Sequence, residues 1–312
     1  MRPRGGPAAG GGRRTPATTA AAAAGTVTTA LRTAAGLPVW RVGLGGAARA
    51  EQEAGLLPAA LADVPAAEAG VVAFLYNPRR YPTFVAGVRR ACAADRGRVC
   101  LCSGTPDRTA AGVEARVRDA VEITGGGQLD AFFAEYVTPG EDLAAVAGAL
   151  AHARALGVPA VGATTHSVAV AADLLDLHEA GAAKLDVLML RYSMAHANHH
   201  AAGTLARARA LGVGLVGFCS TRWNGLLEGG GEGGGGNGAG GRAPTAAECV
   251  RWSLGGVELV VHSSRDEHER VAVMGAPREA AMSDAERAAW LAYGDAWRQA
   301  GGDADGFEAD AA

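Results

Sequence analysis

Lysine is almost absent from this chain: Lys184 is the only one, and the other basic residues are arginines. Any chemistry that depends on a lysine ammonium group must therefore use that single position. An excess of one charge is absent as well, because 29 basic and 32 acidic residues leave a net charge of −3. A chain so close to neutral has no electrostatic reason to bind nucleic acid or an acidic membrane surface.

Long hydrophobic runs and a cysteine framework are also missing. No apolar run reaches the roughly 18 residues that are needed to span a bilayer, so no membrane partner is expected. The five cysteines are odd in number, and their spacing fits neither a disulfide framework nor a CxxC zinc site. We expect reduced thiols in an intracellular compartment. Cys100 and Cys102, two apart on an expected strand, should share a face and fill the core.

Acidic residues are missing from the start of the chain, where Glu51 is the first. Residues 1–35 are rich in Ala, Gly, Arg, Thr and Pro, and they show little periodicity. Such a segment fits an organelle transit peptide, and it equally fits a disordered tail of biased composition. The expected location is therefore the cytoplasm or a plastid.

Two further segments have biased composition. Residues 229–241 are nearly all glycine and predict a flexible loop, which is either a neutral insertion or a lid. Residues 301–312 form an acidic tail that should fray.

Residues 36–300 contain short β-rich apolar runs that alternate with longer segments of helical spacing. Eight such runs predict a parallel sheet covered on both faces, and eight units suit a closed (β/α)8 TIM barrel with a short N-terminal hairpin. The strands are expected at 39–44, 71–75, 99–102, 131–137, 158–162, 185–190, 213–218 and 257–261. Helices are expected at 83–94, 110–123, 142–156, 168–180, 199–211, 245–254 and 283–299.

Six segments then follow one another in a familiar order and spacing. Residues 31–46 fit a hairpin that leads into a first strand, and 260–265 fit an eighth strand that ends in a Ser-Ser-Arg run. The segments between them are similar to the patterns GxSN (161–166), QxxYN (187–193), AYSPL…GLL (215–227) and TPAQVALRW (243–252). Over residues 31–275 this ordered set resembles the aldo-keto reductases. The resemblance implies NADP-dependent reduction of a small-molecule carbonyl compound.

In that family a tyrosine donates the proton, a lysine lowers its pKa, a histidine orients the carbonyl and an aspartate holds the lysine. Here the lysine position falls on Ser103 or Gly104, and Lys184 lies at the opposite end of the barrel, so the lysine is missing. The aspartate position falls on Leu75 or Tyr76. The candidate catalytic residues are Tyr81 at the tyrosine position, Glu135 or Tyr136 at the histidine position, and His166 or Glu135 as a replacement donor. The alternative for Tyr81 is an ordinary loop aromatic. His166 as the donor would titrate near about 6–7.

The expected cofactor-binding residues match the family pattern better than the expected catalytic residues do. Phe218 falls where the family stacks a ring on the nicotinamide, and Ser263, Ser264 and Arg265 fall where it binds the 2′-phosphate of NADP. Met189 replaces a glutamine, which weakens the expected site. The candidate NADP-binding residues are Gly45, Gly46, Thr164, Thr165, Phe218, Ser263, Ser264 and Arg265.

Several alternatives stay open. Arg191 and Arg222 suit an anionic substrate, but Arg191 can also form a structural ion pair with Glu135. His196, His199 and His200 lack a third metal ligand at a fixed spacing, so a surface helix is expected rather than a metal site. The chain is either an oxidoreductase with a remodelled acid–base site or a catalytically silent barrel that binds a nucleotide or a partner protein.

Overall fold

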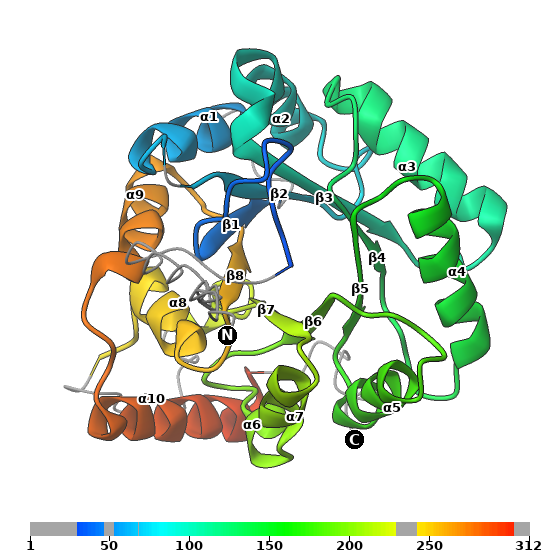
Figure 1. Cartoon of the computed structure of the whole chain (residues 1–312). Coiled ribbons are helices and arrows are strands. Elements are labelled where there is room, and N and C mark those ends of the chain that lie inside the picture. Colours follow the sequence, from blue (N-terminus) through cyan, green and yellow to red (C-terminus); the bar gives the residue numbers. More distant parts are fainter. Residues whose placement is uncertain (1–29, 47–52, 68, 229–241, 303–312) are drawn as a thin grey trace, which may run out of the picture.

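The computed structural model describes residues 30–46, 53–67, 69–228 and 242–302. The expected N-terminal segment up to residue 29, the glycine-rich loop and the tail from residue 303 lie outside these ranges. Within them, eight parallel strands close into one barrel in sequence order, surrounded by helices (Figure 1). The (β/α)8 prediction is confirmed. The strands are β1 (Val42–Gly45), β2 (Val71–Leu75), β3 (Val99–Thr105), β4 (Ala131–Ala134), β5 (Ala160–Thr165), β6 (Val187–Arg191), β7 (Gly214–Phe218) and β8 (Leu259–His262).

The helices alternate with the strands, as the sequence pattern predicts. They are α1 (Glu53–Asp63), α2 (Pro82–Asp95), α3 (Ala110–Thr124), α4 (Leu143–Ala155), α5 (Val168–Glu179), α6 (Asn198–Ala201), α7 (Thr204–Ala210), α8 (Ala246–Leu254), α9 (Glu267–Gly275) and α10 (Asp284–Trp297). None of the described helices is both long and apolar enough to cross a membrane.

Several element boundaries differ from those expected, and three differences from the expected elements illustrate the local causes. The helix expected at 199–211 is divided into α6 and α7, because Gly203 has a left-handed φ of +75°. The strand expected at 131–137 ends at Ala134, because Tyr136 leaves the extended region with a φ of +54°. Helix α1 was not predicted, and it contains Pro58, which usually argues against a helix interior.

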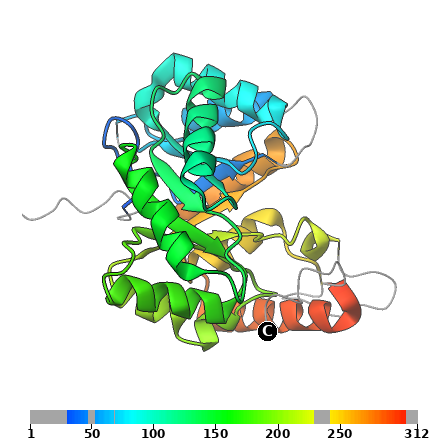
Figure 2. The same ribbon diagram turned by 90° about the vertical axis from the view of Figure 1, so that its right-hand side faces the viewer.

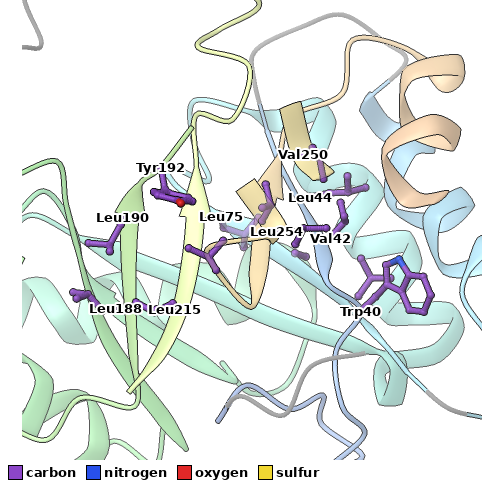
Figure 3. Packing of buried hydrophobic residues seen from close by; sticks show 14 of the residues in the cluster. Trp40, Val42, Leu44, Leu75, Leu188, Leu190, Tyr192, Leu215, Val250 and Leu254 are labelled. Atoms are coloured by element: carbon purple, nitrogen blue, oxygen red, sulfur yellow. The ribbon is translucent and has the colours of Figure 1, made fainter. Parts of the chain in front are cut away.

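The core has two layers, which follow from the alternation of side chains along each strand. Phe74 and Phe133 point into the barrel, where Cys100 and Cys102 are buried with their sulfurs 3.8 Å apart. The cysteines are therefore core residues, as predicted. The outer layer lies between strands and helices, and Figure 3 shows residues of this layer, among them Leu44 of β1 and Leu254 of α8.

The hairpin and the last helix complete the barrel. A single antiparallel bridge joins Arg32 to Pro38 ahead of β1. Helix α10 runs along the outside of the barrel in both ribbon views (Figures 1 and 2). Its residues Trp290 and Trp297 are buried, as their spacing predicts.

Candidate active site

A cavity of about 360 Å³ opens at the carboxyl ends of the strands, the face where barrel enzymes place their active sites. Most of its wall is aromatic or apolar, with a few polar groups, which is the usual composition of a small-molecule site. The lining residues are Gly45, Gly46, Phe74, Tyr76, Arg80, Tyr81, Glu135, Tyr136, Thr164, Met189, Phe218, Cys219, Ser220, Thr221, Trp223, Asn224, Val261, His262 and Ser263.

Most of the residues expected at the site reach this cavity. Gly45, Gly46, Thr164, Phe218 and Ser263 come from the cofactor set. Tyr81, Glu135 and Tyr136 come from the catalytic set.

Three of the expected cofactor residues are not in the wall. Thr165 donates its hydroxyl to Val137 O at 2.8 Å and accepts a hydrogen bond from Ser167 N, so it holds the backbone after β5. Ser264 is buried outside the cavity. Arg265 binds Glu269 through Nε at 2.5 Å, and its side chain remains 46 % exposed.

Glu135 directly follows β4 and is 2 % exposed. Its backbone is fixed, since its N donates to Thr105 O and its O accepts from Arg108 Nη2 at 2.7 Å. Its Oε1 has no hydrogen-bond partner in the part of the chain that the structure describes. Burial raises the pKa of Glu135 to about 8, against the opposing charges of Arg116 and Arg108. The carboxyl group is therefore mostly protonated at neutral pH.

Two tyrosines lie beside this carboxyl group. The rings of Tyr76 and Tyr136 are 5.9 Å apart, and their side chains hydrogen-bond to each other. The left-handed backbone of Tyr136 is uncommon for a residue with a side chain, and its N donates to Thr164 Oγ1 at 2.9 Å. Burial raises the pKa of both tyrosines, which makes each a weak acid at neutral pH.

Tyr81 is packed tightly at the cavity rim. A methyl group on Gly46 would come within 2.9 Å of Tyr81 Cβ, so the glycine allows the ring to approach β1. The guanidinium of Arg80 lies 5.7 Å from the Tyr81 ring. Neither residue at the expected lysine position, Ser103 or Gly104, is a cation, and the Ser103 hydroxyl is buried and donates to Leu75 O at 2.8 Å.

His166 stands behind the cavity, with its ring 5.3 Å from those of Tyr136 and Phe218. Burial and the positive charges of Arg191 and Arg222 lower the pKa of His166 to about 4. This low pKa argues against the titration near 6–7 that was expected for His166 as a proton donor, because it keeps the imidazole neutral at physiological pH.

The histidines after β6 also differ from expectation. His196 and His199 are buried rather than on a surface helix, and His199 also contributes to the low pKa of His166. No three metal-binding side chains come together within the described ranges.

Sequence reasoning named Arg222 in the segment that follows β7, but it missed the unusual backbone of that segment. Positive φ angles, which are rare for residues other than glycine, occur at four positions here: Cys219, Arg222, Trp223 and Asn224. The Arg222 guanidinium lies 4.2 Å from the Trp223 ring, and Trp223 is half exposed at the cavity. The Trp-Asn-Gly sequence at 223–225 was the available signal, because Asn and Gly favour such turns.

Comparison with known proteins supports the fold directly. No protein-family model and no curated protein matches the sequence. Among solved structures, the chain is similar to aldo-keto reductase AKR11C1 from Bacillus halodurans in its holo form, with a TM-score of 0.68 and 13 % identity over 86 % of this chain and 95 % of that one. It is also similar to the glycerol dehydrogenase AKR11B4 from Gluconobacter oxydans, with a TM-score of 0.63 and 13 % identity over 87 % and 95 % of the two chains.

A putative 2,5-diketo-D-gluconic acid reductase B gives a TM-score of 0.59 at 18 % identity, over 86 % of this chain and 91 % of that one. The chain therefore has the fold of the aldo-keto reductases, and the resemblance recognised in the sequence is confirmed at the level of fold.

Proposed function

We propose that this chain reduces a small carbonyl compound with NADPH, and that Glu135 donates the proton in place of the tyrosine–lysine pair. The observation that carries the proposal is a buried carboxyl group, with a pKa raised to about 8, in the wall of the cavity. A carboxylic acid that stays protonated at neutral pH is an effective proton donor. Tyr76 and Tyr136 are weaker acids, and His166 is already neutral.

The residues present fit the nicotinamide half of the cofactor. Phe218 offers a half-buried ring at the end of β7, and Thr164 and Ser263 offer hydroxyl groups in the same wall. Arg265 uses Nε for Glu269, and its half-exposed guanidinium still has terminal nitrogens to offer a 2′-phosphate. When bound, NADPH supplies the hydride for the carbonyl carbon.

The chain's own residues would then handle the proton and exclude water. The Glu135 carboxyl group donates its proton to the carbonyl oxygen as negative charge develops there. Phe74, Met189 and Val261 keep the cavity apolar, which holds this carboxyl group in its protonated form. We infer an anionic carbonyl substrate, because the positive charges of Arg191 and Arg222 act on His166, whose ring lies next to those of Tyr136 and Phe218 in the cavity wall.

Single-turnover oxidation of NADPH tests the proposal, with a panel of aldehydes, ketones and keto acids. Glu135→Gln should lower the rate by about 10²–10⁴-fold, the usual contribution of acid catalysis. Glu122→Gln is the matched control, because Glu122 is an exposed carboxylate on α3. An unchanged rate in Glu135→Gln would remove Glu135 from the mechanism. Quenching of tryptophan fluorescence by NADPH without any turnover would favour a silent nucleotide-binding barrel instead.

A further inference from the structure

A serine, a histidine and a glutamate form a hydrogen-bonded chain on the β7–β8 side of the cavity. Ser220 lies two residues beyond β7, and its Oγ is 3.4 Å from Nδ1 of His262, the last residue of β8. On the other side of the imidazole, His262 Nε2 is 2.9 Å from Glu269 Oε1 in α9. Ser220 and His262 line the cavity, whereas Glu269 is buried behind them.

The glutamate is held in one orientation by several bonds. Its Oε2 accepts from Arg265 Nε at 2.5 Å, and its Oε1 also accepts from Arg265 N at 3.2 Å. Its backbone N donates to the Asp266 side chain at the start of α9. Burial opposes ionisation of this group, but the hydrogen bonds and charges of His262 and Arg265 outweigh burial and lower the pKa of Glu269 to about 2. The group is therefore a carboxylate throughout the physiological range.

The charge on Glu269 sets which nitrogen of the imidazole donates to it. An ionised carboxylate only accepts hydrogen bonds, so His262 Nε2 must carry the proton that joins them. In a neutral imidazole the other nitrogen is then unprotonated, which makes Nδ1 the acceptor that faces the Ser220 hydroxyl. This order of nucleophile, base and orienting carboxylate is the arrangement that activates a serine, and its first hydrogen bond is often long before substrate binds.

We propose that Ser220 is a nucleophile and His262 its general base, and that the chain hydrolyses small esters with an apolar acyl group, independently of NADPH. Glu269 is the positioning residue for His262. The cavity suits such an ester, because Phe74, Phe218 and Met189 give it apolar walls and its volume admits only a small molecule.

The reaction proceeds in two balanced halves. The Ser220 Oγ forms a bond to the ester carbonyl carbon while its proton passes to His262 Nδ1, and that proton then leaves with the alcohol as the carbon–oxygen ester bond breaks. A water molecule next forms a bond to the acyl carbon, and its proton returns through His262 Nδ1 to Oγ as the acyl–serine bond breaks. No oxidant or reductant takes part in either half.

A fluorophosphonate probe and p-nitrophenyl acetate test this proposal on the full chain without NADPH. Attack by Ser220 forms a phosphorus–oxygen bond and expels fluoride, which leaves a stable label. Trypsin cleaves after Arg209 and Arg222, so the label should appear on the peptide 210–222, where fragment ions distinguish Ser220 from Cys219 and Thr221. Steady hydrolysis of p-nitrophenyl acetate should accompany the labelling.

Ser220→Ala should abolish the label on this peptide and lower hydrolysis by about 10²-fold or more. Ser193→Ala is the matched control, because Ser193 Oγ is also 3.4 Å from a histidine Nδ1, that of His196, but Ser193 is not among the described residues that line the cavity. The Ser193→Ala variant should react with the fluorophosphonate probe at the rate of the natural chain.

The positioning role of Glu269 needs a measurement besides the loss of rate, because Glu269→Gln could also lower the rate by perturbing α9. Glu269→Gln should slow labelling by at least about tenfold, and Glu269→Asp should restore part of the rate although both variants melt at a similarly reduced temperature. Absence of label, label on Cys219, or label that survives Ser220→Ala would overturn the proposal. None of these outcomes bears on NADPH oxidation, which depends on Glu135 and is measured separately.

Discussion

The Cγ atom of Glu135 occupies the space into which a side chain on Gly104 would extend. A methyl group on Gly104 would lie 2.7 Å from Glu135 Cγ and 2.2 Å from Phe133 O. Gly104 is at the end of β3, one of the two positions where the family pattern has its lysine. At the Gly104 position a lysine and Glu135 would therefore exclude each other, since a long side chain on Gly104 and Glu135 cannot share this space.

Gly104→Ala should therefore destabilise the fold, because the added methyl group meets backbone that cannot move aside cheaply. We expect a loss of about 1–3 kcal/mol in the free energy of unfolding, measured by urea denaturation. Gly148→Ala is the matched control: a methyl group on Gly148 in α4 meets nothing within 4 Å, and alanine is the better helix former. That variant should be neutral or slightly more stable. Equal stability of the two variants would contradict the packing argument.

The raised pKa of Glu135 also predicts how stability depends on pH. The folded carboxyl group binds its proton up to a pH of about 8, whereas an unfolded glutamate loses it near about 4.3. The contribution of the protonated form to stability is therefore complete below about pH 4 and is lost progressively as the pH rises to about 8. Glu135→Gln cannot ionise and should remove this dependence.

Urea unfolding at pH 5, 7 and 9 measures the effect. The natural chain should lose on the order of a few kcal/mol relative to Glu135→Gln over this range. Glu122→Gln, which changes an exposed carboxylate, should keep the pH dependence of the natural chain. Parallel pH curves for the natural chain and Glu135→Gln would show that the folded carboxyl group ionises like an exposed one.

The barrel could be predicted from the sequence because its signals are local. Alternating apolar runs and glycine-capped helices recur along the chain, and left-handed glycines follow α4 and α7 at Gly157 and Gly212, where Ala-Leu-Gly-Val predicts them. Helix α1 lacked such a signal because Pro58 interrupts it. The early end of β4 depends on the backbone of Tyr136, which no sequence pattern indicates.

The site could be predicted only in part, because its chemistry arises from contacts between distant residues. Thr164 and Thr165 are neighbours on β5, and successive side chains on a strand face opposite sides, so only one of them can line the cavity. That rule was available from the sequence. The pairing of Ser220 with His262, and the burial that raises the pKa of Glu135, exist only once the barrel has closed.

Helix α10 should stabilise the segment Gly225–Leu227, which directly follows the cavity-lining residues after β7. Tyr293 donates its hydroxyl to Leu226 O at 2.8 Å, and Trp297 Nε1 donates to Gly225 O at 3.1 Å. Tyr293→Phe removes one donor and leaves a buried carbonyl without that bond, which should cost about 1 kcal/mol and lower the Tm by about 2–4 °C. Asp295→Asn changes a half-exposed group on the same helix, whose weak ion pair with Arg298 spans 3.4 Å, and it should shift stability by less than about 0.5 kcal/mol. Equal melting temperatures for the two variants would mean that the Tyr293 bond contributes nothing.

Arg265 provides the sharpest test of cofactor preference, because two forms of the cofactor differ only in the 2′-phosphate that it would contact. Its guanidinium is half exposed beyond the cavity, and Glu269 holds it through Nε. A phosphate dianion could accept hydrogen bonds from the remaining nitrogens, and loss of such bonds costs about 1–3 kcal/mol. Arg265→Ala should therefore weaken NADPH binding by about 5–150-fold while it leaves NADH binding within about twofold.

Tryptophan fluorescence titration measures both dissociation constants, and NADH acts as the internal control for any shift in α9. Arg265→Lys keeps the charge but cannot donate from two nitrogens in a fixed fork, so it should recover only part of the NADPH affinity. If Arg265→Ala lowers the affinities for NADPH and NADH by the same factor, Arg265 supports the loop through Glu269 and does not bind the 2′-phosphate. If neither dissociation constant changes, the 2′-phosphate lies elsewhere, and the preference for NADPH over NADH loses its structural basis.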